Sequence, residues 1–426
     1  MTRSLPQPPE PATPDSGGLV ERVFAIAVLL VFTDGIIRLL VTEGRPSGVD
    51  LGEGSRAYQL AAAFTYFGTL LLVLSRPTRM MRLARTHWLL LLPVLLAITS
   101  ATWSQEPTLS IRRGIALLAT TAFAFYLTSR YSFRQFLRLL GFTFALVVLS
   151  SFVFGIGLRK YGVHSDIHAG DWRGIFVHKN RLGLMMVLGL TVFASLAIGE
   201  RGLARTASLA SAVGAGILLI LSNSVLSAIV GAFVLFTLPV LLLQRQRRTG
   251  GWILGAWLGC AAAGVALALA NAGAILPHIG RDPTFSGRTF LWAVSLDRWL
   301  DRPILGYGYR AFWIAGASAS ANAWKLLGWE PTSAHNSFLD ILLELGIVGL
   351  IPFLMMLLRY APFLFRSLRR GPFGVWYILA TIALTSLSLG ESVLLAQNSI
   401  SWVMLVATFI YARQQSSDTL PPAAGA

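Results

Sequence analysis

Residues 337–358 read SFLDILLELGIVGLIPFLMMLL, an apolar run whose only charged residues are Asp340 and Glu344. A run of this length can cross the hydrocarbon core of a bilayer as a helix. Of the 426 residues in the chain, 55% are hydrophobic and 13% are charged. A soluble domain carries about 25% charged residues. The sequence therefore predicts an all-α integral membrane protein.

Apolar runs of similar length recur along the chain and predict about twelve membrane-spanning helices. Together they form a polytopic domain over residues 19–412. Residues 1–18 are rich in proline and polar residues, so we expect a disordered cytoplasmic tail there. Residues 413–426 are expected to form a second cytoplasmic tail. The expected spans are 19–41, 57–75, 88–103, 111–128, 134–157, 182–199, 205–222, 224–243, 252–276, 337–358, 374–390 and 396–412.

Arginines are concentrated in the loops that follow the even-numbered spans. Cytoplasmic loops of membrane proteins are enriched in Lys and Arg, so these loops and both termini are expected inside the cell. The same bias accounts for the net charge of +16 without a nucleic-acid partner. The arginines are Arg76, Arg79, Arg82, Arg85, Arg130, Arg134, Arg138, Arg201, Arg205, Arg245, Arg247, Arg248, Arg359, Arg366, Arg369 and Arg370.

Two extracytoplasmic loops break this charge pattern, residues 158–181 and the large loop 277–336 between the ninth and tenth spans. Both contain histidines and basic residues, so we expect the functional surface there. In the first loop, Arg173, His178, Lys179 and Arg181 precede or begin a helix. A helix N-terminus with Arg and Lys suits a phosphate or diphosphate. The alternative is an interfacial anchor that contacts lipid headgroups.

The large loop contributes a second candidate, Arg288. The stretch 288–300 mixes aromatic, aliphatic and charged residues and predicts a helix lying in the outer membrane interface. Arg288 at its start could bind a phosphate, and the alternative is an arginine that faces lipid.

The third candidate is His335 at the start of the tenth span. Asn336, Asp340 and Glu344 follow at four-residue spacing, which places them on one helix face that should point into the bundle. The positive end of the helix dipole disfavours a cation, so His335 is expected to be a neutral base that can accept a proton from a hydroxyl. The alternative is a water-exposed helix cap. Glu391 could orient this base or bind sugar hydroxyls, or be a buried, hydrogen-bonded carboxyl.

Metal and nucleotide chemistry find little support in the sequence. His164 and His168 lie four residues apart near two aspartates, but no cysteine pair or His-Glu-x-x-His pattern accompanies them. No Walker A sequence is present, which argues against transport driven by ATP. We therefore expect no metal and no cofactor.

The motifs resemble those of the O-antigen ligase and O-antigen polymerase family. His335–Asn336 is followed after nine residues by Gly346–Ile347–Val348–Gly349, which is similar to the family signature. Further segments resemble the family's loop pattern and its exopolysaccharide-production, polymerase-like branch. They are Gly287–Arg288–Thr289, Pro303–Ile304–Leu305–Gly306–Tyr307–Gly308, Arg173–Gly174, His178–Lys179–Asn180 and the stretch from Glu391 to Trp402.

This resemblance implies a glycosyltransferase of the GT-C type in the bacterial inner membrane, with its active site facing the periplasm. The implied donor is an undecaprenyl-diphosphate-linked glycan, and the acceptor is a hydroxyl of another glycan or of lipid A-core. Arg288 would hold the diphosphate, and His335 would activate the acceptor. Membrane lipids and a chain-length regulator are the other expected partners.

One departure separates this chain from the ligases, which usually carry an arginine at the turn between the seventh and eighth spans. Here residues 222–227 contain none. Either a basic residue of the 173–181 stretch substitutes for it, or the reaction differs. The sequence therefore favours a polymerase of repeat units, with a ligase or a non-enzymatic lipid-glycan transporter as alternatives.

Overall fold

The computed structural model describes residues 18–42, 56–246, 252–270 and 287–417. The expected N-terminal tail, except for Gly18, lies outside the described residues, as do the last residues of the C-terminal tail and 277–286 of the large loop. Within the described part the chain is helical and has no strand, and one isolated bridge joins Val163 to Trp172.

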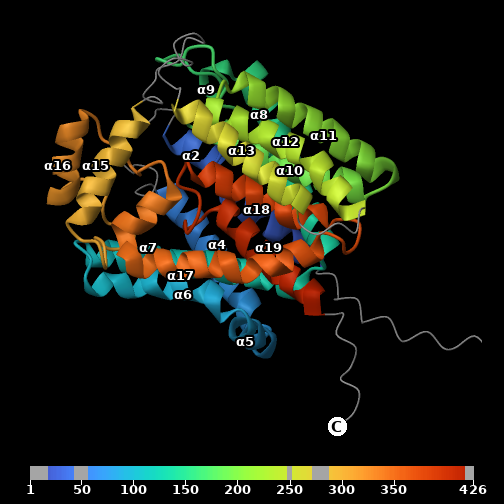
Figure 1. The fold of residues 1–426 in the computed structure, drawn as a ribbon, viewed down its shortest axis with the longest axis horizontal. Helices are drawn as coiled ribbons and strands as arrows, with labels where there is room; N and C mark the ends of the chain where they lie inside the picture. Colours follow the sequence, from blue (N-terminus) through green and yellow to red (C-terminus); the bar gives the residue numbers. More distant parts are fainter. Residues whose placement is uncertain (1–17, 43–55, 247–251, 271–286, 418–426) are drawn as a thin grey trace, which may run out of the picture.

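The described helices follow the order in which the apolar runs occur, and each expected span overlaps at least one helix (Figure 1). They are α1 (Leu19–Val31), α2 (Ile36–Val41), α4 (Arg56–Leu74), α5 (Pro77–Thr86), α6 (Trp88–Thr99), η1 (Ser100–Thr102), α7 (Pro107–Arg130), α8 (Phe133–Gly157), α9 (Arg159–Gly162), α10 (Lys179–Gly199), α11 (Gly202–Leu221), α12 (Val225–Gln246), α13 (Trp252–Ala270), α15 (Arg288–Leu300), α16 (Ser318–Leu327), α17 (Ser337–Ser367), α18 (Val375–Ser388) and α19 (Ile400–Ser417).

Six of the described helices are long and apolar enough to cross a membrane, namely α4, α8, α10, α11, α12 and α17. A seventh span results if α5 and α6, which meet at 92°, count together. The chain is thus a multi-pass membrane protein, while the number of about twelve spans stays a prediction. The expected span 19–41 is not one helix, because the chain turns at Asp34, whose φ is +59°, and this turn separates α1 from α2.

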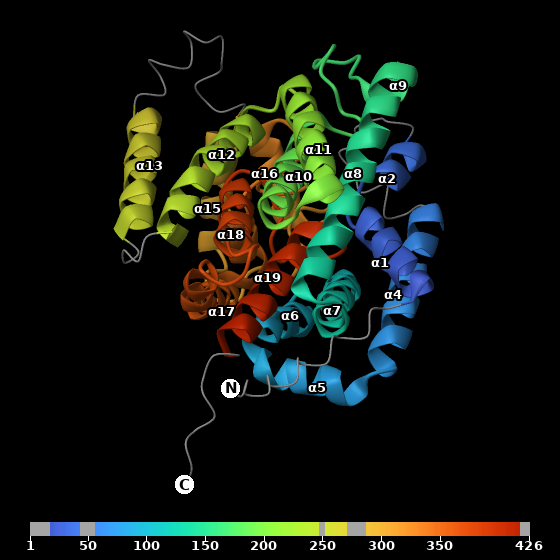
Figure 2. The same cartoon turned by 90° about the vertical axis from the view of Figure 1, so that its right-hand side faces the viewer.

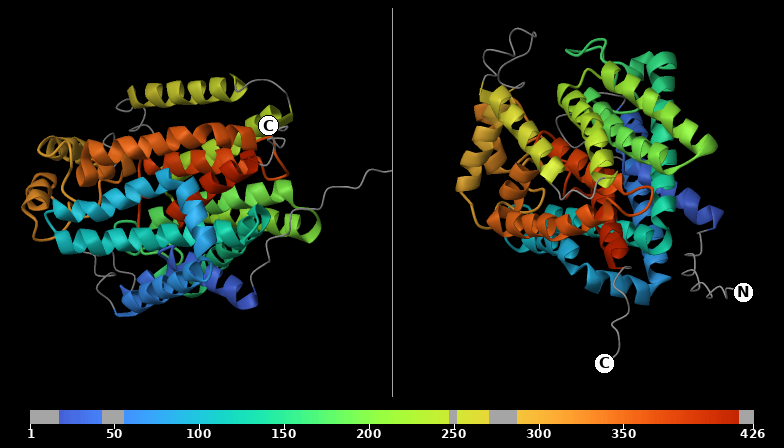
Figure 3. Two further views of the ribbon diagram at one scale, coloured as in Figure 1. Left: turned by 90° about the horizontal axis from the view of Figure 1, so that it is seen from below. Right: turned by 45° about the vertical axis from the view of Figure 1, so that its right-hand side comes forward.

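The centre of the bundle is formed by α10, α18 and α19. Helix α10 packs against α8, α11, α12 and α18, while α19 packs against α7, α17 and α18. The indole rings of Trp376 on α18 and Trp402 on α19 are fully buried. In contrast, α4 and α11 expose many large apolar side chains, as expected for helices that face lipid. Figures 2 and 3 show α13 at the edge of the bundle.

The helices of the large loop before α17 cover one end of the bundle. Helix α15 has the bounds that the sequence predicts, 288–300, and it packs against both α16 and the beginning of α17 (Figure 1). A small separate core of aromatic and aliphatic residues, including Tyr307, Phe312 and Leu343, joins this loop to α17. The loop is therefore anchored where His335 precedes α17.

Candidate active site

A break inside α17 creates the scaffold of the site. Gly346 has φ +62° and ψ −160°, which interrupts the helix, and the segment 303–308 lies against the break. A side chain at Gly346 would place its Cβ 2.2 Å from the carbonyl oxygen of Ile304, and one at Gly306 would lie 2.5 Å from that of Leu343. Both glycines are therefore required by close backbone contact. The joining bonds are Tyr307 N to Leu343 O (2.8 Å), Gly308 N to Glu344 O (2.9 Å), Ile347 N to Pro303 O (3.0 Å) and Val348 N to Ile304 O (3.2 Å).

The other side of the same loop is held by polar side chains between η1 and the first turns of α7. These residues bind the backbone of 305–311, and the loop consequently places Arg310, with φ +54°, at the cavity described below. The bonds, each written from donor to acceptor, are Tyr309 N to Ser100 Oγ (2.9 Å), Trp103 Nε1 to Leu305 O (2.8 Å), Gln105 Nε2 to Ala311 O (2.6 Å), Ser110 Oγ to Tyr309 O (3.0 Å) and Arg113 Nη1 to Arg310 O (2.7 Å).

A polar cavity of about 410 Å³ lies where these elements meet. It brings together side chains from the α1–α2 turn, α7, α10, the outer loop, α17 and the segment before α19. Its charged and imidazole-bearing lining residues are Asp34, Arg38, Arg113, His178, Arg181, Arg310, His335, Glu344 and Glu391.

His335 and Glu391 form a hydrogen-bonded pair at this cavity. His335 Nδ1 lies 3.2 Å from Glu391 Oε2, and the other carboxylate oxygen lies 2.7 Å from Arg288 Nη2. The His335 side chain is 30% exposed, while that of Glu391 is 17% exposed. Arg288 also donates to the carbonyl of Gly390. Arg288 does not line the cavity. Its side chain binds the carboxylate of Glu391, which also contacts His335.

The charge of Glu391 fixes the tautomer of His335. Burial alone would raise the pKa of Glu391, but the hydrogen bond with His335 and the charge of Arg288 hold it well below its usual range. The carboxylate is then an acceptor, so the neutral imidazole carries its proton on Nδ1 and leaves Nε2 unprotonated. Nε2 is therefore available as a base.

The His178 ring has the opposite tautomer to that of His335. Its Nδ1 accepts a hydrogen bond from the backbone N–H of Asn180 at 3.2 Å, so the neutral ring carries its proton on Nε2. Burial, with the nearby rings of His164 and His168, lowers the pKa of His178 to about 4. Near neutral pH this imidazole is an uncharged hydrogen-bond donor at the cavity.

The predicted polar stripe after His335 has a mainly positioning role. Asn336 is the N-cap of α17, and its side-chain oxygen accepts from the N–H groups of Phe338 and Leu339. Asp340 accepts from the N–H of Ala334 at 2.8 Å and from the hydroxyl of Ser392. These bonds hold the turn in which His335 adopts φ +48°, an unfavourable backbone conformation for a non-glycine residue.

Glu344, the last residue of the stripe, does reach the cavity. Its carboxylate is 6% exposed and lies 3.8 Å from the Nε of Arg310. Although burial lowers the pKa of Arg310, the charge of Glu344 raises it above the ordinary value. Arg310 is consequently a permanent cation at the cavity.

The three basic residues expected for a diphosphate in the 173–181 stretch separate in space. Arg181 lines the cavity and donates to the carbonyl of Thr33 at 3.1 and 3.2 Å. Arg173 is buried against the carbonyls of Tyr161 and Lys160, away from the cavity lining. Lys179 is buried in an ion pair of 2.6 Å with Asp171.

Lys179 nevertheless approaches the turn at which an arginine is missing. The amide of Asn223 donates to Asp171 Oδ1 at 3.0 Å, while Lys179 contacts Oδ2 of the same carboxylate. Lys179 of the 173–181 stretch and Asn223 of the 222–227 turn thus bind the same carboxylate, that of Asp171.

Sequence reasoning missed Arg310 and Arg113. Arg38 and Asp34 form an ion pair of 2.8 Å, and both residues also line the cavity. The available signal for Arg310 was its place two residues after Gly308, at the end of the Gly306–Tyr307–Gly308 motif. The rings of His164, His168 and His178 lie 5.3–5.6 Å apart, yet in the described part of the chain no cluster of ligand residues is arranged to hold a metal ion.

Comparison with known proteins shows which proteins this chain resembles. Residues 209–354, which include His335 and the break in α17, match the family model of O-antigen ligase. The resemblance to the O-antigen ligase family is therefore confirmed. The chain is also similar to the exopolysaccharide production protein ExoQ of Rhizobium meliloti, with 30% identity over 270 residues. That region spans 60% of this chain and 60% of the relative. The putative polysaccharide ligase RC0486 of Rickettsia conorii is 33% identical over 86 residues, 20% of this chain and 21% of its own length.

Proposed function

We propose that the protein is a membrane glycosyltransferase that moves a glycan from undecaprenyl diphosphate to an acceptor hydroxyl at the outer face of the bacterial inner membrane. The observation that carries the proposal is the pair of His335 and ionised Glu391 at a cavity that also contains fixed guanidinium groups. A base beside a cationic pocket suits attack by a hydroxyl and departure of a diphosphate.

In the proposed reaction the acceptor oxygen attacks the anomeric carbon of the donor while the bond from that carbon to the diphosphate oxygen breaks. The electron pair leaves with the lipid diphosphate, and the hydroxyl proton passes to Nε2 of His335. Glu391 stabilises the resulting imidazolium through its bond to Nδ1. Attack opposite the leaving group inverts the anomeric configuration.

We assign the diphosphate to Arg310 and Arg181, with Arg38 and Arg113 completing a cationic lining. Guanidinium groups bind phosphate oxygens in a bidentate manner and can stabilise the charge that develops on a leaving diphosphate. Arg288 keeps a role in this proposal, but through Glu391, because its contacts are with that carboxylate and with Gly390.

Repeat-unit polymerisation is the favoured form of this activity. The similarity to the exopolysaccharide production protein covers 60% of the chain, whereas that to the rickettsial ligase covers 20%. The turn at 222–227 also lacks the arginine that ligases usually carry. Transfer to lipid A-core by a ligase is the second candidate, favoured by the family match over residues 209–354.

Sizing of the product separates these functions. The purified chain is reconstituted in liposomes with an undecaprenyl-diphosphate-linked repeat unit, and the lipid-linked products are resolved by length. A polymerase gives longer lipid-linked chains without any added acceptor. A ligase gives product only when lipid A-core is added, and the absence of transfer under both conditions would contradict the proposed function.

A further inference from the structure

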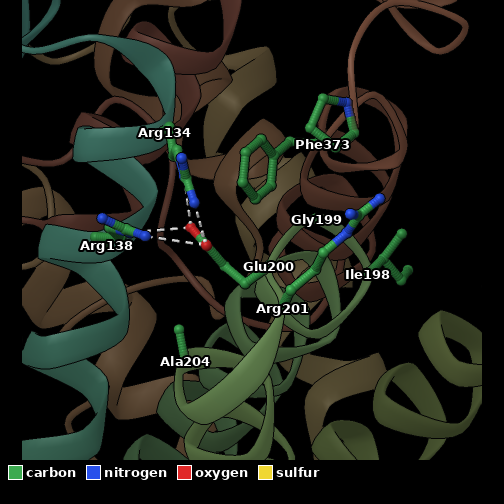
Figure 4. A pocket seen from close by; sticks show the side chains of 9 residues that line it. Arg134, Arg138, Ile198, Gly199, Glu200, Arg201, Ala204 and Phe373 are labelled. Atoms are coloured by element: carbon green, nitrogen blue, oxygen red, sulfur yellow. Dashed lines mark hydrogen bonds and ion pairs between the residues drawn. The ribbon is translucent and has the colours of Figure 1, made fainter.

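A second cavity lies at the opposite end of α10 from the candidate active site. It measures about 440 Å³ and is lined by Arg134, Arg138, Ile198, Gly199, Glu200, Arg201, Ala204, Pro372 and Phe373 (Figure 4). His178 caps the first end of α10, and Glu200 caps the other. A helix of 21 residues is about 30 Å long, close to the thickness of the hydrocarbon core. The two cavities are thus separated by about one membrane thickness.

The charges at this cavity are unbalanced. Figure 4 shows Arg134 and Arg138 reaching from α8 to the one carboxylate of Glu200, with contacts of 2.6–2.9 Å. The Glu200 side chain is 2% exposed, whereas those of the two arginines are 55% and 52% exposed. Arg201 is also exposed. The cavity lining therefore contains three guanidinium groups and one carboxylate, and two of the three arginines bind that carboxylate. Much of the surface of these arginines is accessible to a ligand.

The surroundings of the cavity are suited to lipid chains. On α8, the exposed side chains of Phe142, Leu149 and Ile156 recur at the spacing of one helix face that also contains Arg138. On α11, Leu209, Val213 and Ile217 form a similar exposed apolar stripe. Helices α8 and α11 pack against each other. Along each helix, the apolar stripe leads away from the end at which the arginines lie.

We propose that this cavity binds the headgroup phosphate of an anionic phospholipid, with its acyl chains along α8 and α11. The loops that form it follow even-numbered spans and are rich in arginine, so we expect this end to face the cytoplasmic leaflet, where anionic lipids attract basic residues. Glu200 keeps Arg134 and Arg138 side by side without neutralising the site. This binding is separate from the proposed glycan transfer.

Native mass spectrometry of the full-length protein in a neutral detergent tests the proposal. We expect retained phosphatidylglycerol, with an affinity about tenfold above that for zwitterionic phosphatidylcholine, because both lipids carry the phosphate but only phosphatidylcholine also carries a quaternary ammonium that the arginines repel. Arg201→Gln, which changes an exposed side chain, should weaken phosphatidylglycerol binding by about three- to tenfold. The double variant Arg138→Gln/Arg201→Gln should weaken it further.

Arg85→Gln is the matched control, because Arg85 is exposed on α5 and does not line the cavity. An equal loss in Arg85→Gln and Arg201→Gln would overturn the proposal in favour of a diffuse basic surface. Inorganic phosphate is titrated in a parallel series. Displacement of the lipid by millimolar phosphate with equal affinity would show a site for free phosphate, and would also overturn the assignment to a lipid.

Discussion

His335, Glu391 and Arg288 form a chain of contacts that gives each residue a different role. Arg288 holds one oxygen of the Glu391 carboxylate, and the other oxygen faces Nδ1 of His335. The carboxylate thereby sets which imidazole nitrogen can accept a proton. In the proposed reaction, such a glutamate is a positioning residue that acts through His335 and does not contact the acceptor itself.

Substitution of Glu391 tests this role. Glu391→Gln removes the negative charge that stabilises an imidazolium on His335 and presents an amide to Nδ1. We expect the turnover rate to fall by about 10²- to 10⁴-fold, the usual contribution of a positioned base. The rate is measured as release of lipid diphosphate. Glu330→Gln is the control, because Glu330 is exposed in the same outer loop, and an equal effect of both variants would contradict the role of Glu391.

The half-buried imidazole of His178 predicts a pH dependence of stability. Its pKa is about 4 in the folded protein and about 6.5 when it is unfolded. Between these values the unfolded state binds more protons, so stability falls as the pH decreases from 6.5 to 4. Thermal unfolding in detergent should show this fall, and His178→Gln should reduce it. Identical slopes for the two proteins across this window would contradict the burial of a neutral ring.

At the scale of elements, the apolar pattern predicts where helices form but not where they break. Helix α15 has the predicted bounds of 288–300, whereas the run 19–41 is divided at Asp34 and α17 is interrupted at Gly346. Both breaks depend on a positive φ and on contacts with distant segments. The periodicity of an apolar run contains no information about such contacts. The sequence signal for the break in α17 is the pair of glycines Gly306 and Gly346 in the two family-like motifs.

The break in α17 can be tested directly. Gly346→Ala adds a Cβ 2.2 Å from a backbone oxygen at a residue with φ +62°, so something must shift. We expect a destabilisation of about 1–3 kcal/mol and a loss of transfer activity, because the loop that carries Arg310 is displaced. Gly216→Ala in α11 is the control, since its added Cβ meets no atom within 4 Å. Wild-type activity of Gly346→Ala would show that the break is not needed.

At the scale of the whole molecule, the sequence predicted some of the residues that line the polar cavity beside His335 at one end of the bundle, but not all of them. His178, Arg181, His335, Glu344 and Glu391 were expected and do line it. Arg173 and Lys179 are engaged elsewhere, and Arg310 was missed. Charge patterns identify the loops that violate the topology rule, but which arginine enters a cavity is decided by the path of the loop backbone.

The central claim is that His335 accepts the proton of the attacking hydroxyl in transfer from a lipid diphosphate. The most direct measurement is the initial rate of undecaprenyl diphosphate release by reconstituted wild-type and His335→Ala proteins, with equal membrane insertion verified for both. We predict that His335→Ala reduces this rate by at least about 10²-fold, as expected for loss of a general base. A rate within about twofold of the wild type would contradict the claim.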